Sequence, residues 1–121
     1  MVKTKDPKRV TKKELKRIKK REINKKDKEW REKVKTRDKK TCQICGRTDI
    51  IHCHHILPRE NKEYRWNIHN GICLCPKHHK FSREISAHMN SFIFVIWLQR
   101  NKKQQIEKLF ETIIKYKEVK N

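Results

Sequence analysis

The sequence predicts an α+β fold, in which a small central core is flanked by a basic helix before it and apolar helices after it. Three observations support this. Residues 1–40 carry 20 basic and 7 acidic side chains. Apolar residues are concentrated in the middle, with 26 among the 60 residues from 41 to 100, against 6 in the first 29. Both glycines also lie in the middle, whereas long flanking stretches contain neither Gly nor Pro, as is typical of helices.

The first element is a helix predicted over residues 11–38. Thr11 and Glu14 have the spacing of a capping box, in which a hydroxyl and a carboxylate satisfy opposite free amides of the first turn. Acidic residues precede basic ones by four positions, as Asp27 precedes Arg31, and each such pair adds a few tenths of a kcal/mol, roughly, to an exposed helix.

Three regions are expected along the chain. Residues 1–29 form a basic, largely helical arm, because they contain too little apolar surface to fold alone. Trp30 and Val34 are one helical turn apart and dock the end of this helix on a core domain over residues 30–98. Residues 99–121 form a C-terminal amphipathic helix.

The core is predicted to run strand, turn, strand, helix. A short β-rich segment over residues 50–56 is followed by a polar loop over 58–67. Asn70-Gly71 is typical of a tight turn, and 72–74 form a second short strand. The pattern becomes helical from Pro76 onwards.

Two further helices are predicted after the core. Asn90-Ser91 caps a helix whose residues 92–98 are apolar nearly all round, so this run is either buried or in contact with another chain. Apolar residues at helical spacing predict an amphipathic helix over about 102–118. Two oligomeric states stay open: a monomer in which these helices complete the fold, and a homodimer in which they form the interface.

The net charge of +20 at pH 7 indicates a polyanionic partner. Nucleic acid fits better than a membrane surface, because no strongly apolar helix face accompanies the basic residues. A basic helix lying on phosphates is favoured over a merely solvated charged helix. The side chains expected to contact DNA from the arm are Lys12, Lys13, Lys16, Arg17, Lys19 and Lys20.

Other classes are disfavoured. The longest apolar run has seven residues, whereas a membrane span needs about 20. The polycationic N-terminus has no apolar segment behind it, which argues against secretion. Five cysteines close to histidines argue for metal binding in a reducing compartment, so a cytoplasmic location is expected.

Two Cys/His pairs with the same spacing predict a structural zinc site. The first pair is Cys42 and Cys45, and Gly46 allows the chain to turn back after it. The second pair is Cys75 and His78, and Cys75 lies thirty residues after Cys45. Three thiolates and one imidazole make a closed tetrahedral site of the kind that holds structural Zn²⁺. The two remaining cysteines, Cys53 and Cys73, are interpreted as small buried hydrophobic residues, one on each strand.

Four polar residues near this knuckle need another explanation. His54 and His55 are neighbours on a strand and so point to opposite faces, which means that they cannot do the same job. His79 directly follows the zinc ligand, and Asn70 lies nine residues before it. A hydrogen-bonded core histidine is the usual alternative, but it explains three such histidines poorly.

These residues resemble the HNH endonucleases, the zinc-knuckle branch of the His-Me finger nucleases. The resemblance covers about residues 30–98 and implies a ββα-metal core. His78 stands where that family usually has a cysteine. Residues 54–59 and 86–88 look most like small phage-encoded enzymes, including free-standing homing endonucleases. The motif consists of Cys42-x-x-Cys45, His54-His55-Ile56, Asn70 and Leu74-Cys75-Pro76-Lys77-His78-His79.

The resemblance implies a role for each residue. His54 and His79 would hold one divalent ion that stabilises charge developing on the scissile phosphate and the leaving 3′ oxygen. His55 would act as the general base towards water, and Asn70 would hold the loop that orients His55. The products would carry a 5′-phosphate and a 3′-hydroxyl. Two arginines are expected to contact phosphate, Arg59 and Arg83.

The resemblance also bears on the catalytic ion. Some colicin-type relatives have a third ligand histidine one helical turn after the His79 position. Arg83 stands there instead, so a site with two histidines is expected. Imidazole ligands favour softer ions, whereas cellular abundance favours Mg²⁺, so Mg²⁺ or Mn²⁺ is expected.

Three functions remain open. The expected one is a metal-dependent endonuclease that nicks or cuts double-stranded DNA, of the phage homing type. The second is a non-catalytic, zinc-dependent nucleic-acid-binding protein. The third is a nuclease subunit of a packaging or restriction system.

Overall fold

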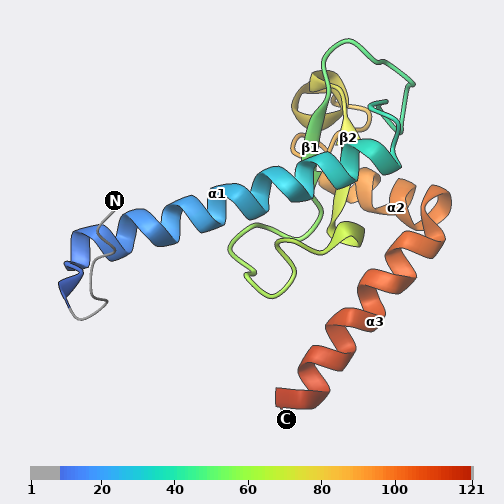
Figure 1. Ribbon diagram of the computed structural model, residues 1–121. Coiled ribbons are helices and arrows are strands. Elements are labelled where there is room, and N and C mark those ends of the chain that lie inside the picture. The colour runs from blue at the N-terminus through green and yellow to red at the C-terminus, as the bar shows by residue number, and fades with distance from the viewer. Residues whose placement is uncertain (1–8, 121) are drawn as a thin grey trace.

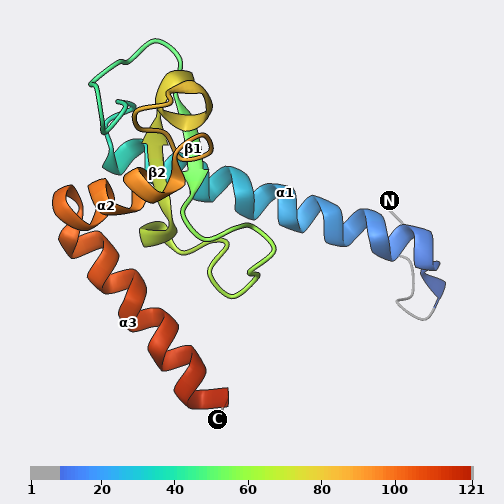
Figure 2. The same cartoon turned by 180° about the vertical axis from the view of Figure 1, so that it is seen from behind.

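The structure, a computed structural model, describes residues 9–120, so the first eight residues of the predicted arm lie outside the described part. It is an α+β fold with one small antiparallel sheet (Figure 1). Two long helices project from the region of the sheet, and the view from behind shows the same arrangement (Figure 2). In chain order the elements are α1 (Lys12–Arg37), β1 (His52–His55), the 3₁₀ turn η2 (Ile68–Asn70), β2 (Gly71–Leu74), the π-helical turn η3 (Lys77–Phe81), α2 (Ser91–Asn101) and α3 (Lys103–Lys120).

Helix α1 confirms the predicted N-terminal helix almost to its ends. The Thr11 hydroxyl accepts a hydrogen bond from the backbone N–H of Glu14 at 3.2 Å, which caps the first turn. Trp30 and Val34 are its two buried residues, and both lie near its C-terminal end. The helix therefore docks by its last turns, while its N-terminal half extends away from the sheet (Figure 1).

The sheet separates two clusters of buried side chains. Strands β1 and β2 pair with Cys53 opposite Cys73 and His54 opposite Ile72. Because side chains alternate along a strand, Cys73 faces α1, where it packs with Trp30 and Val34. Its neighbours on β2 face the other way and form the larger cluster, which contains Cys42, Ile72, Leu74, Cys75, Ala87, Phe94 and Leu98.

The predicted tight turn at Asn70-Gly71 is wrong. Asn70 ends η2, and Gly71 begins β2 with an extended φ of −129°. The glycine is needed for space: a Cβ atom there would lie 2.5 Å from Trp30 Cζ2 and 2.5 Å from Val34 Cγ2. The helix predicted from Pro76 is also shorter than expected, because only the five-residue turn η3 forms there.

We expect Gly71→Ala to destabilise the fold by about 1–3 kcal/mol, because the new methyl group collides with the docked face of α1. Thermal unfolding of both proteins measures this. Val34→Ala removes one of the two colliding groups, so the cost of Gly71→Ala should be smaller in that background. An unchanged melting temperature for Gly71→Ala would show that α1 does not approach the strand this closely.

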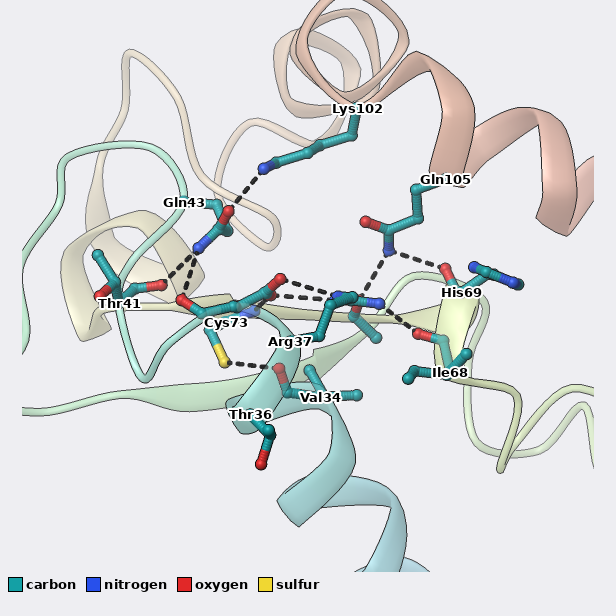
Figure 3. A network of polar contacts seen from close by, with 12 residues as sticks. Val34, Thr36, Arg37, Thr41, Gln43, Ile68, His69, Cys73, Lys102 and Gln105 are labelled. Atoms are coloured by element: carbon teal, nitrogen blue, oxygen red, sulfur yellow. Dashed lines mark hydrogen bonds and ion pairs between the residues drawn. The ribbon is translucent and has the colours of Figure 1, made fainter.

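An ion pair between half-buried Arg37 and buried Asp38 fixes the C-terminal end of α1. Arg37 donates from Nε and a terminal nitrogen to the two carboxylate oxygens of Asp38, at 2.8 and 3.0 Å. The same guanidinium donates to the carbonyls of Ile68 and Gly71. Asp38 also accepts from the backbone N–H of Cys73 at 2.9 Å. This network holds the end of α1 on η2 and β2 (Figure 3).

Helix α3 is joined to the same region by two side chains. Lys102, just before α3, donates to the side-chain carbonyl of Gln43 at 2.6 Å, and Gln43 donates to the Asp38 carbonyl at 3.1 Å. Gln105 donates to the Gly71 carbonyl at 2.8 Å (Figure 3). The loop that leads into the cysteine pair is thereby tied to the C-terminal helices.

The apolar helix α2 is buried on one face. Asn90 caps it, as predicted, by accepting from the backbone N–H of Ile93 at 3.3 Å. Phe94 and Leu98 are buried, whereas Phe92 is 73% exposed. The apolar run is therefore not buried all round. No helix within residues 9–120 combines the length and apolar character that crossing a membrane requires.

Candidate metal centres and active site

The two Cys/His pairs meet at one point, as their spacing predicted. The ligand atoms of Cys42, Cys45, Cys75 and His78 all lie within 4.8 Å of one another. Cys45 Sγ lies 3.7 Å from Cys75 Sγ, and His78 Nδ1 lies 3.3 Å from Cys75 Sγ and 3.8 Å from Cys42 Sγ. In a tetrahedral zinc site, sulfur atoms about 2.3 Å from the metal lie about 3.8 Å apart. The donor set and its spacing therefore fit Zn²⁺.

Local backbone geometry positions these ligands. Gly46 has a φ of +81°, which favours glycine, and its N–H donates to the Cys42 carbonyl at 2.8 Å. This turn brings Cys45 back beside Cys42. Cys75 directly follows strand β2, and His78 lies on η3 three residues later. The knuckle thus joins the end of the sheet to the loop after α1.

The two other cysteines lie apart from the knuckle. Cys53 and Cys73 are opposite each other in the sheet and face α1. Their thiols point at helix carbonyls, with Cys53 Sγ 3.6 Å from the Arg31 oxygen and Cys73 Sγ 3.9 Å from the Val34 oxygen. Cys73 is fully buried and Cys53 is half-buried, which agrees with a packing role for Cys73 and only in part for Cys53.

A second cluster contains three histidines. His54 on β1, His79 on η3 and His88 in the following loop place one ring nitrogen each within 4.8 Å of one another. The Nε2 atoms of His79 and His88 are 3.1 Å apart. No acidic side chain belongs to this cluster among the described residues. Three imidazole lone pairs converging on one point can hold a divalent transition-metal ion, Mn²⁺ among them.

The structure brings the two predicted ligands, His54 and His79, together and places His88 beside them. Arg83, one turn after His79, was the position compared with the third histidine of relatives. However, η3 ends at Phe81 and the chain turns back. The N–H of His88 then donates to the His79 carbonyl at 3.0 Å, which brings the two rings together. Sequence spacing along a regular helix could not reveal this contact.

Two histidines of the cluster, His54 and His79, resist protonation. Burial, followed by the charges of His79 and His88, lowers the pKa of His54 to about 3. Burial likewise lowers the pKa of His79 to about 4. Neutral imidazoles keep a lone pair for a metal ion, as a histidine ligand must.

His55 points to the opposite side of β1, as strand alternation predicted. Its ring stacks on Trp30, with centroids 3.8 Å apart and planes 8° from parallel. Its Nε2 lies 2.9 Å from the Arg65 carbonyl. A carbonyl only accepts, so Nε2 carries the proton and the neutral ring has its lone pair on Nδ1. Burial lowers the pKa of His55, which favours this neutral form.

Asn70 is fully buried and fixes the loop that supplies that carbonyl. Its side-chain oxygen accepts from the Leu57 N–H at 2.6 Å, and its amide donates to the carbonyls of Leu57 and Tyr64, both at 3.1 Å. Asp27 of α1 holds the same loop from outside by accepting from the Arg65 guanidinium at 2.9 and 2.7 Å. Asn70 therefore acts on the position of His55 through the loop.

The three-histidine cluster and His55 all line one cleft of about 550 Å³. Its basic lining residues are Arg31, Arg59 and Lys80. Arg83, predicted to contact phosphate, is exposed but does not line the cleft. Arg31 and Lys80 were not predicted from sequence to line the cleft, since nothing distinguishes them from the many other basic residues of the chain. The six predicted arm residues are all exposed near the start of α1.

Comparison with known proteins agrees with this geometry. Residues 42–82 match a family model described as HNH endonuclease. No curated protein and no solved structure matches the chain. The matched segment contains the whole zinc knuckle together with His54, His55, Asn70 and His79, whereas His88 lies beyond it. Residues 42–82 are therefore similar to HNH endonucleases over the segment that carries the knuckle and three of the cleft histidines.

Proposed function

We propose that this protein is a metal-dependent endonuclease that hydrolyses phosphodiester bonds of double-stranded DNA. One observation supports this most strongly. His54, His79 and His88 on one side of strand β1, and His55 on the other, all open into the same cleft. A protein that only bound DNA would need the knuckle and the charge but not this arrangement.

His54, His79 and His88 would hold the catalytic ion, with Mn²⁺ or Mg²⁺ as the working metal. When bound, a divalent ion supplies charge stabilisation for the transition state at the phosphate and the leaving oxygen. Three nitrogen donors suit Mn²⁺ better than Mg²⁺, which prefers oxygen ligands. The ion at Cys42, Cys45, Cys75 and His78 would be structural zinc.

His55 would accept the proton of the attacking water at Nδ1, because Nε2 is engaged with the Arg65 carbonyl. Trp30 holds the ring plane by stacking, and Asn70 holds the loop. Both would act by positioning His55. When His55 becomes an imidazolium, the Arg65 carbonyl still accepts from Nε2, so the protonated ring keeps its orientation.

The basic lining would place the phosphate. Arg59 lines the cleft from the loop and Arg31 from α1, and Lys80 follows His79. We propose these three as phosphate contacts beside the reacting bond. Arg83 remains a proposed contact with more distant phosphates, because it is exposed next to η3.

The charges at the start of α1 would supply general affinity for DNA. Substitution of Lys12, Lys13, Lys16, Arg17, Lys19 and Lys20 by glutamine leaves the docked end of the helix intact. If about five of them contact phosphates, log K should fall less steeply with log[salt], with the slope reduced by about 4 to 5. Salt titrations of binding to target and random DNA measure this.

The six glutamine substitutions should lower the affinity equally for all DNA sequences. Glutamine keeps helix propensity, so the helix content in circular dichroism serves as the control. An unchanged slope would place the phosphate contacts elsewhere. A loss confined to target DNA would mean that the arm reads sequence. The substitution is preferred to deletion of residues 1–29, because deletion would remove Asp27, which holds Arg65.

The biological role is proposed from the resemblance alone: a phage homing-type endonuclease acting in the cytoplasm of the host cell. One such site cuts one strand. A double-strand break would need two sequential nicks, a homodimer or a partner nuclease. The exposed apolar side chains of α2 and α3, including Phe92 and Phe110, are where a second copy would dock in the dimeric case.

The chemistry of the product ends tests this proposal. The purified protein is incubated with supercoiled plasmid and phage DNA, with and without Mn²⁺, and the ends are mapped. We expect 5′-phosphate and 3′-hydroxyl ends, which DNA ligase reseals at nicks. Binding without any cleavage in Mn²⁺ or Mg²⁺ would instead support the non-catalytic zinc-dependent binding protein.

A further inference from the structure

A fourth histidine, His52, contacts the cluster through His79. His52 lies on β1 two residues before His54, so both side chains point to the same face of the strand. Its Nδ1 is 2.9 Å from Nδ1 of His79, and the two rings meet edge to face, with centroids 5.1 Å apart. His52 is half-buried and is outside the group of three whose ring nitrogens converge.

Hydrogen-bond chemistry assigns the proton in this contact. Two ring nitrogens at 2.9 Å form a hydrogen bond only if one carries a proton and the other a lone pair. The other nitrogen of His79, Nε2, faces His88 at 3.1 Å and needs its lone pair to bind a metal ion. A neutral imidazole has one proton, so that proton must be on Nδ1 of His79. His52 then accepts it.

We propose that His52 is a positioning residue that fixes the tautomer and ring orientation of the metal ligand His79. This inference rests on the proposed function and deepens it, because it assigns the residue that prepares one ligand of the catalytic ion. Metal-binding histidines usually donate their second N–H to a carboxylate or carbonyl, and here an imidazole takes that place. Within the described part of the chain, His52 is the hydrogen-bond partner of Nδ1 of His79.

If His52 acts by accepting a hydrogen bond, the effect of a substitution on metal affinity should depend on whether the new side chain has an acceptor, and not on its size. His52→Leu keeps the bulk of the ring but has no acceptor. His52→Asn can place its amide oxygen close to the position of Nδ1 and accept the same proton. His69→Leu is the matched control, because His69 is also half-buried, whereas it is His52 that contacts His79.

The experiment is calorimetric titration of Mn²⁺ into the full-length, zinc-loaded protein, which measures affinity without reference to activity. We expect His52→Leu to bind Mn²⁺ about 10–100-fold more weakly than the parent protein. His52→Asn should recover most of that affinity, and His69→Leu should bind like the parent. Zinc content and melting temperature should be close to the parent's in all three variants.

Each alternative has its own signature. Equal Mn²⁺ affinity in His52→Leu and the parent would overturn the inference. So would loss of Mn²⁺ binding in His52→Asn as complete as in His79→Ala, because His52 would then be a ligand itself. Failure of the proposed function looks different: the parent protein would neither bind Mn²⁺ beyond its zinc nor cleave DNA.

Discussion

Replacing His55 by alanine lowers the rate of DNA cleavage by about 10²–10⁴-fold, because a general base contributes on this scale to the chemical step. DNA affinity stays nearly unchanged, since the base acts only after the DNA is bound. Single-turnover cleavage with saturating Mn²⁺, together with an independent binding measurement, separates the two effects.

The stacking of His55 on Trp30 requires a second variant. His55→Phe keeps a ring against Trp30 and loses the nitrogen lone pair, so it should be as slow as His55→Ala while α1 remains docked. His69→Ala controls for the loss of a histidine elsewhere and should cleave at the parental rate. Parental cleavage by both His55 variants would show that another group activates the water.

Replacing Cys42 by alanine releases the zinc and unfolds the central part of the protein. Cys42 is buried and is one of the four residues that would hold the zinc in a closed site. Structural zinc in small domains contributes on the order of 10 kcal/mol of apparent binding free energy, which exceeds the stability of most small folds. Metal analysis should give one tightly bound zinc per parental chain and a large deficit in the variant.

Cys53→Ala is the matched cysteine control. Cys53 is half-buried against α1 and outside the ligand group, so this variant should retain its zinc and its thermal transition. A zinc-free preparation of the parent with an unchanged circular dichroism spectrum and melting temperature would contradict a structural role for the metal.

The sequence predicted those parts of the fold that depend on local signals. Thr11 and Asn90 cap helices where their side chains indicated. Each pair of knuckle residues is closed by a local hydrogen bond, from Gly46 N–H to the Cys42 carbonyl and from His79 N–H to the Cys75 carbonyl, and such contacts are encoded within a few residues. Gly71 was misread, because its requirement comes from Trp30 and Val34, about forty residues away, and a glycine needed for close approach looks the same as one in a turn.

The candidate site shows the same division. Strand alternation correctly separated His54 from His55. The place of His88 in the cluster was missed, because it reaches His54 and His79 through a reversal after η3 that no periodicity describes. The carbonyl of Arg65 carries no sequence signature at all, since every residue has one. Its importance depends on how Asn70 and Asp27 hold the loop, which only the folded structure shows.

The most direct test of the proposed nuclease is the conversion of supercoiled plasmid by the zinc-loaded, full-length protein before and after addition of Mn²⁺. The His55→Ala variant, purified identically, controls for contaminating nucleases. The predicted result is nicked or linear plasmid with the parent protein only when Mn²⁺ is present, and almost none with the variant. Intact plasmid that is bound by the parent protein, or equal conversion by parent and variant, would contradict it.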